Sequence, residues 1–129
     1  MALTYSPEIV NGRLNLVLQS AGDGALITIY RGTRPEPGGP PTNALAVLTC
    51  GTPFAPAPEN GVLIANPIVG EATDSGSNPT WFRLASSGGV FVMDGDVGTS
   101  LESDFVVSSN VFIEGGKVEV VEFILTGAS

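Results

Sequence analysis

The chain has 129 residues, the length of one domain with one core, and its 17 glycines and 10 prolines beside 43% hydrophobic residues favour short strands over a helical bundle. Its net charge of −8 argues against nucleic acid as a partner, because phosphate binding needs clustered lysine and arginine. With no histidine and with Cys50 as the single cysteine, the sequence lacks the usual catalytic base and cannot form an intrachain disulfide.

The first predicted element is a short helix over residues 6–19. Ser6 can cap its start, and Pro7 suits its first position because the missing N–H would have no partner there. Its apolar stripe, at helical spacing, includes Val10, Leu14 and Leu18. This stripe must cover either the domain's own sheet or a neighbouring subunit, and in the second case these three residues form an oligomer contact.

Apolar-rich runs with turn residues between them predict the strands of an all-β domain. The runs are residues 25–30, 44–50, 62–66, 80–85, 90–94, 104–108, 111–113 and 117–126. Ser86–Gly89 predicts the tight turn of a hairpin between two of them. We expect an antiparallel β-sandwich, jelly-roll-like in topology, in a single domain over residues 1–129 with the N-terminal helix as a cap.

The last predicted strand changes its alternation part of the way along. Val118 and Val120 share one face, but Val121 and Phe123 continue the apolar set on the other. A β-bulge near Val120–Val121 would restore a single buried face. Alternatively, the strand is central and buried on both sides.

Two connections, residues 31–43 and 51–61, are long and rich in proline and should be extended loops. Each is either an ordinary surface loop or an arm that lies along a neighbouring protein, since prolines reduce the entropy lost on docking. Arg31 and Arg34 lie on the first loop. Their planar guanidinium groups suit bidentate contacts with a partner, so both are candidate partner-binding residues.

Trp81 and Arg83 point to one side of a predicted strand, and Phe82 and Leu84 point to the other. If Phe82 and Leu84 face the core, Trp81 and Arg83 are exposed and are candidate partner-binding residues, because both types are enriched at binding hot spots. If instead Trp81 and Arg83 face the core, Trp81 is a core residue and predicts no interface.

The acidic segment Asp94–Asp104 is the one constellation that resembles a metal site. A calcium-binding loop needs an oxygen ligand at its fifth position, glycine at its sixth and glutamate at its twelfth. Counted from Asp94, these positions hold Gly98, Thr99 and Phe105. We therefore predict solvated turn residues, no metal, and stability that does not respond to a chelator, with an irregular Ca²⁺ site as the alternative. Together with the missing histidine, this predicts a protein that is not an enzyme and binds no cofactor.

Met1–Val10 lacks the basic start and apolar core of a signal peptide, and no apolar run approaches the roughly 20 residues of a membrane helix. The sequence therefore predicts synthesis in a reducing cytoplasm and no membrane contact.

Four segments occur in an order that resembles small virion structural proteins of tailed bacteriophages and prophages. They are Leu3–Ser6, Ile29–Pro35, Thr80–Arg83 and Met93–Gly98. The chain departs from that pattern in the proline-dense stretches Arg34–Pro41 and Pro53–Pro58, and in Ser86–Gly89.

The resemblance implies a capsid decoration, or cement, protein that binds the major capsid protein on the outer surface of the virion and forms a homo-oligomer. It also leaves two other roles open: a minor tail or neck component, and a virion module that binds carbohydrate on the host surface. A sugar-binding module should present exposed aromatic rings, whereas the aromatic residues here lie mostly inside apolar runs.

Overall fold

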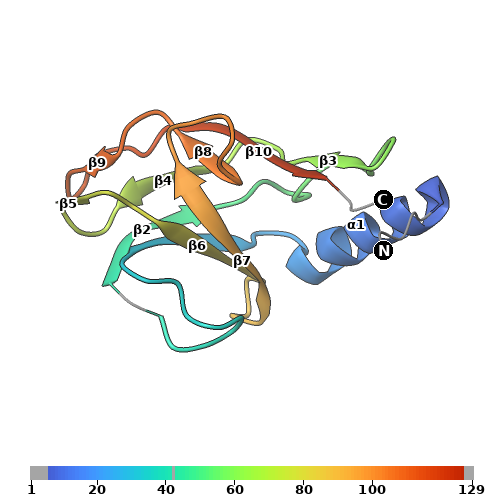
Figure 1. Ribbon diagram of the computed structural model, residues 1–129, viewed down its shortest axis with the longest axis horizontal. Coiled ribbons are helices and arrows are strands. Elements are labelled where there is room, and N and C mark those ends of the chain that lie inside the picture. The colour runs from blue at the N-terminus through green and yellow to red at the C-terminus, as the bar shows by residue number, and fades with distance from the viewer. Residues whose placement is uncertain (1–5, 42, 127–129) are drawn as a thin grey trace, which may run out of the picture.

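The computed structural model describes residues 6–41 and 43–126, so Leu3, Thr4 and Tyr5 lie outside the described residues. One helix lies beside a curled sheet of eight strands and a separate pair of short strands (Figure 1). The elements are α1 Pro7–Ala21, β1 Leu26–Arg31, β2 Asn43–Thr49, β3 Val62–Ile64, β4 Val69–Ala72, β5 Gly76–Ser77, β6 Trp81–Ala85, β7 Phe91–Gly98, β8 Phe105–Val107, β9 Val111–Phe112 and β10 Val120–Thr126.

The large sheet has the strand order β3-β10-β8-β7-β6-β1-β2-β4, and β5 pairs with β9. The β4 edge of this sheet curls back to the segment that precedes β10. There the amide of Ala72 donates to the carbonyl of Gly116 at 2.8 Å, and the amide of Val118 donates to the carbonyl of Gly70 at 3.0 Å. The strands therefore wrap around one core. The sandwich and jelly-roll topologies stay predictions.

The expectation of a purely antiparallel sheet is wrong, because β7 and β8 run parallel. Their pairing joins Val97 to Phe105 and Gly98 to Val106. Since only the last two residues of β7 are paired in this way, the short connection 99–104 can bring the chain back without the long crossover that a longer parallel pair requires.

The predicted helix is confirmed and ends slightly later than expected. The Ser6 hydroxyl accepts a hydrogen bond from the Ile9 amide at 3.3 Å, and Gly22, with φ 66°, ends the helix by donating its amide to the Leu18 carbonyl. Within the described ranges, no helix is long and apolar enough to cross a membrane.

The helix stripe covers the chain's own core. Val10 and Leu14 are buried, Leu18 is half-buried against the core cluster, and the Asn11 carboxamide accepts a hydrogen bond from the Gly61 amide at 2.9 Å. The interpretation of Val10 and Leu14 as an oligomer contact is therefore wrong, because a neighbouring subunit could reach them only if the helix left the domain, whereas for the half-buried Leu18 it stays a prediction.

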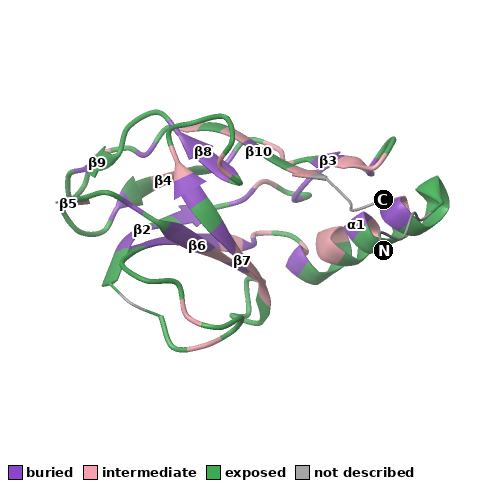
Figure 2. Cartoon of the chain, in the orientation of Figure 1, coloured by how far each residue is buried: buried purple, intermediate pink, exposed green. Residues whose placement is uncertain are grey.

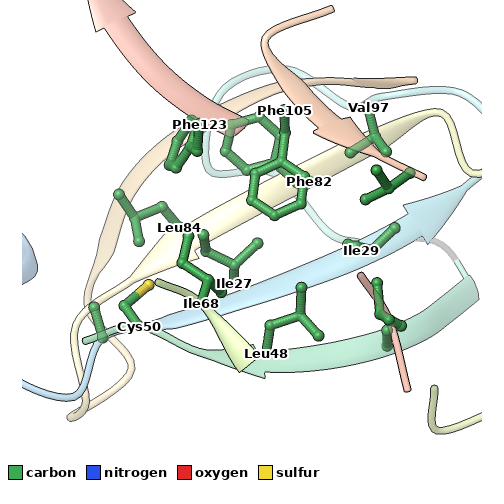
Figure 3. Packing of buried hydrophobic residues seen from close by; sticks show 14 of the residues in the cluster. Ile27, Ile29, Leu48, Cys50, Ile68, Phe82, Leu84, Val97, Phe105 and Phe123 are labelled. Atoms are coloured by element: carbon green, nitrogen blue, oxygen red, sulfur yellow. The ribbon is translucent and has the colours of Figure 1, made fainter. Parts of the chain in front are cut away.

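Buried residues recur along the strands of the curled sheet (Figure 2), and their side chains form one core cluster. At its centre Phe82, Phe105 and Phe123 form an aromatic cluster with ring centroids 5.1–5.4 Å apart (Figure 3). Phe54 adds an edge contact to Phe123 at 6.1 Å. The second proline-rich loop is thus no free arm, since its Phe54 and Ala55 are buried in the core.

The bulge predicted in the last strand is confirmed. Val120 pairs with Val107 and Glu122 pairs with Val106, so Val121 is the extra residue. Val121 is exposed, whereas Val118 before it and Phe123 after it are buried. The shift in alternation therefore keeps a single buried face along the strand, and the alternative of burial on both sides is wrong.

Candidate functional site

A shielded ion pair beside aromatic rings lies on the outer side of β1, β6 and β7, beneath the first proline-rich loop. On β6, Phe82 and Leu84 face the core cluster, so Trp81 and Arg83 face outward. Trp81 nevertheless has 0% exposure, because it stacks on Tyr30 of β1 with the ring centroids 4.2 Å apart and the planes at 17°. The expectation that outward parity exposes Trp81 is therefore wrong.

Arg83 lies between two aromatic rings and is paired with a carboxylate. Its guanidinium carbon is 5.3 Å from the centroid of Trp81 and 5.3 Å from that of Phe91. Its Nε donates to Asp94 Oδ1 at 2.8 Å, and its Nη2 donates to Asp94 Oδ2 at 3.1 Å. The side chains of Arg83 and Asp94 are only 15% and 4% exposed, so this pair is shielded from water. The hydrogen bonds to Asp94 raise the pKa of Arg83 and keep it charged.

The same pair holds the first proline-rich loop in place. Arg83 Nη2 donates to the Gly39 carbonyl at 2.8 Å, and the Gly38 amide donates to Asp94 Oδ2 at 3.3 Å. At the start of the loop, the Thr80 hydroxyl donates to the Gly32 carbonyl at 2.6 Å. The loop is therefore fixed across β6 and β7 at two separate points, although its backbone makes few regular hydrogen bonds.

The structure separates Arg31 from Arg34. Arg34 lies 3.4 Å from Asp96 Oδ1, and both side chains are substantially exposed. Arg31 ends β1 beside Gly76 of β5. Of the four arginine and tryptophan residues predicted to bind a partner, Arg34, Trp81 and Arg83 thus lie on one side of β6 and β7, while Arg31 contacts the small sheet.

The acidic segment is not a turn at its start, because Asp94 and Asp96 belong to β7. Asp94 pairs with Arg83, Asp96 lies beside Arg34, and Asp104 Oδ2 accepts a hydrogen bond from the Asp96 amide at 2.9 Å. Across residues 6–41 and 43–126, no group of three His, Cys, Asp or Glu side chains is placed to hold a metal ion. These carboxylates connect strands and loops within the domain.

Cys50 lies at the end of β2 in the core, and burial raises the pKa of its thiol from 9.0 to about 12. The thiol is therefore neutral at physiological pH and is a poor nucleophile in the folded protein.

We expect Cys50 to react with a thiol reagent about a thousandfold or more slowly in the native protein than in denaturant, because reaction must await an opening that costs about 5 kcal/mol. The neutral thiol stabilises the fold below pH 9, and this contribution is lost as the pH rises towards about 12. Urea unfolding of the wild type and Cys50→Ala across this range should therefore give a shallower pH dependence for the variant. Equal slopes, or rapid native modification, would contradict the burial argument.

The sequence interpretation missed Asp94, Tyr30 and Phe91 as members of this site. The Ser86–Gly89 turn alone does not predict the ion pair, because Arg83 and Asp94 face each other only after the register shifts between Leu84 and Ala85. The loop residues Gly38 and Gly39 carried no signal either, because their approach depends on how the long loop folds back.

No family model, curated protein or solved structure matches this chain.

Proposed function

We propose that this protein is a non-enzymatic decoration protein of a tailed bacteriophage head, which binds the major capsid protein of the assembled shell from outside. The sequence resemblance suggests the class. The observation that carries the proposal is the fixed proline-rich loop: Arg83 and Asp94 hold it at Gly38 and Gly39, while Pro37 and Pro40 are exposed. A loop ordered in advance loses little entropy when it docks on a neighbouring surface.

Such a protein acts by coupling its own binding to the stability of the assembled shell. A molecule that binds the assembled lattice better than the separate capsid subunits stabilises the lattice, and many copies add their modest individual contributions. Arg34 at the start of the fixed loop offers a guanidinium group for carboxylate or carbonyl groups of the shell. Arg31, at the end of β1 beside the small sheet, would contact the shell at a separate point.

Two other roles belong to the same proposal as alternatives. A tail or neck component would use the same loop at a single vertex, and the number of copies in each particle distinguishes it from a decoration protein. A module for host carbohydrate would need an exposed aromatic platform, and the burial of the stacked Tyr30 and Trp81 counts against it.

We expect the double substitution Arg31→Ala/Arg34→Ala to lower occupancy on purified particles after a salt wash, with an affinity about tenfold weaker, because two rim contacts of up to about 1 kcal/mol each are lost. The matched control is Arg13→Ala/Lys117→Ala, which removes two positive charges outside the loop and should keep normal occupancy. Circular dichroism establishes that both variants fold. Unchanged occupancy of the loop variant would contradict the attachment role of the two arginines, and a copy number of a few per particle would contradict decoration.

A further inference from the structure

The dipeptide Asn–Gly occurs twice in the sequence, as Asn11–Gly12 and as Asn60–Gly61. Asparagine that precedes glycine is especially prone to lose ammonia spontaneously. Glycine has no side chain to hinder the attack of its backbone nitrogen on the side-chain carbon of asparagine, and its backbone adopts the required conformation easily. The two dipeptides therefore have similar intrinsic reactivity, and the fold determines which of them can react.

The helix protects the first dipeptide. Asn11 and Gly12 both lie inside α1, where the N–H of Gly12 has an intrahelical acceptor four residues earlier in the chain. Attack by the Gly12 nitrogen requires this part of the helix to open. Asn11 is therefore unreactive in the native fold.

The second dipeptide forms an exposed turn. Glu59 and Val62 exchange two backbone hydrogen bonds across it, of 3.0 and 2.9 Å. Asn60 and Gly61 have φ angles of 51° and 74°, the conformation of a type I′ turn, for which Asn–Gly is a preferred sequence. Asn60 is exposed and Gly61 is half-buried, so water reaches this dipeptide in the folded protein.

The two dipeptides meet in the fold. The side-chain oxygen of Asn11 accepts a hydrogen bond from the backbone N–H of Gly61 at 2.9 Å. This nitrogen is the one that must lose its proton and attack Asn60, so the bond holds it in its protonated form and in the geometry of the turn. Gly61 also lies close to the helix, because a Cβ atom added to it would be 3.2 Å from Val10 Cγ1.

We propose that Asn60 is a site of spontaneous deamidation, and that the Asn11 carboxamide keeps this site unreactive in the native fold. The reactivity comes from the turn sequence, and the protection comes from a side chain on the helix that packs beside it. This inference is independent of any role in a virion.

The reaction is an intramolecular substitution followed by hydrolysis. The Gly61 nitrogen forms a bond to Asn60 Cγ, the bond from Cγ to Nδ2 breaks, and ammonia leaves with the proton that the Gly61 nitrogen loses. Water then opens the succinimide ring at either of its two carbonyl groups, which gives aspartate or isoaspartate. The atoms balance with water as the co-reactant.

The isoaspartate product changes the turn as well as its charge. It adds one carbon to the backbone path between Glu59 and Val62, and it places a second carboxylate next to Glu59. A type I′ turn joins its strands through two residues of fixed geometry, so the longer backbone cannot keep the same hydrogen bonds. The Gly61 N–H then loses its position beside Asn11, and the contact between α1 and β3 loosens.

The test incubates the full chain in mildly alkaline buffer and measures conversion of Asn60 by peptide mapping and mass spectrometry. We expect Asn11→Ala to raise the rate in the native protein about fivefold, the factor that corresponds to about 1 kcal/mol for one net hydrogen bond. In urea the wild type and the variant should react equally and faster, since neither then forms the bond. The proposal would be overturned by equal native rates, or by an Asn60 that stays unmodified in urea.

Two matched variants separate this hydrogen bond from a general loosening of the helix. Asn15→Ala makes the same change one turn further along α1 and should leave the rate at Asn60 unchanged. Asn11→Asp keeps an oxygen acceptor for the Gly61 N–H and should react as slowly as the wild type. If Asn15→Ala or Asn11→Asp accelerated the reaction as much as Asn11→Ala does, the protective role of the Asn11 carboxamide would be refuted.

Discussion

We expect Phe82→Ala to lower the free energy of unfolding by about 3–5 kcal/mol, a large share of the 5–15 kcal/mol typical of a small domain. Phe82 is fully buried and contacts both Phe105 and Phe123 in the aromatic cluster. Gly95 lies opposite in β7, where a Cβ atom would come within 2.5 Å of Phe82 Cε1, so the ring fills the space that the glycine leaves. Removing the ring leaves a cavity that these neighbours cannot close.

Urea unfolding followed by circular dichroism measures this effect. The matched control is Phe91→Ala, which removes the same ring from a partly exposed position on the other side of the sheet and should cost much less. If the two variants lost equal stability, the placement of the core inside the curl would be wrong.

The second large effect is expected for Asp94→Asn, which should lower the free energy of unfolding by about 3 kcal/mol. This substitution leaves the shielded guanidinium of Arg83 without its counter-ion, and the loss of one partner of a buried pair typically costs about 3–5 kcal/mol. It also weakens the acceptor of the Gly38 amide. We therefore expect the loop of residues 32–41 to become protease-sensitive and to exchange its amide hydrogens faster.

Asp96→Asn is the control, because it makes the same chemical change two residues along β7 at an exposed ion pair with Arg34. Its cost should stay within about 1 kcal/mol, the usual limit for a surface pair. A loop that stays equally protected in Asp94→Asn would show that the loop is not held by this pair, and it would remove the main support for a preordered docking arm.

Several local features could be predicted from the sequence. Ser6 and Pro7 marked the helix start, Ser86–Gly89 marked the hairpin, and the change of parity after Val120 marked the bulge. Each of these signals acts over a few residues, through a cap, a turn or the two-residue period of a strand. β4 and β5 were missed because they are short and contain glycine, and pairing with β2 and β9 defines them instead.

Only the tertiary structure determined which of the residues that look exposed in the sequence are buried or paired. The two-residue period placed Trp81 and Phe82 on opposite sides of β6, but both are buried, because Tyr30 covers the outer ring while the core covers the inner one. Asp94 likewise looked like a turn residue until its pairing with Arg83 placed it under the loop. Sequence periodicity determines which side chains share a face, whereas the long-range folding of loops and strand edges determines which faces remain open to a partner.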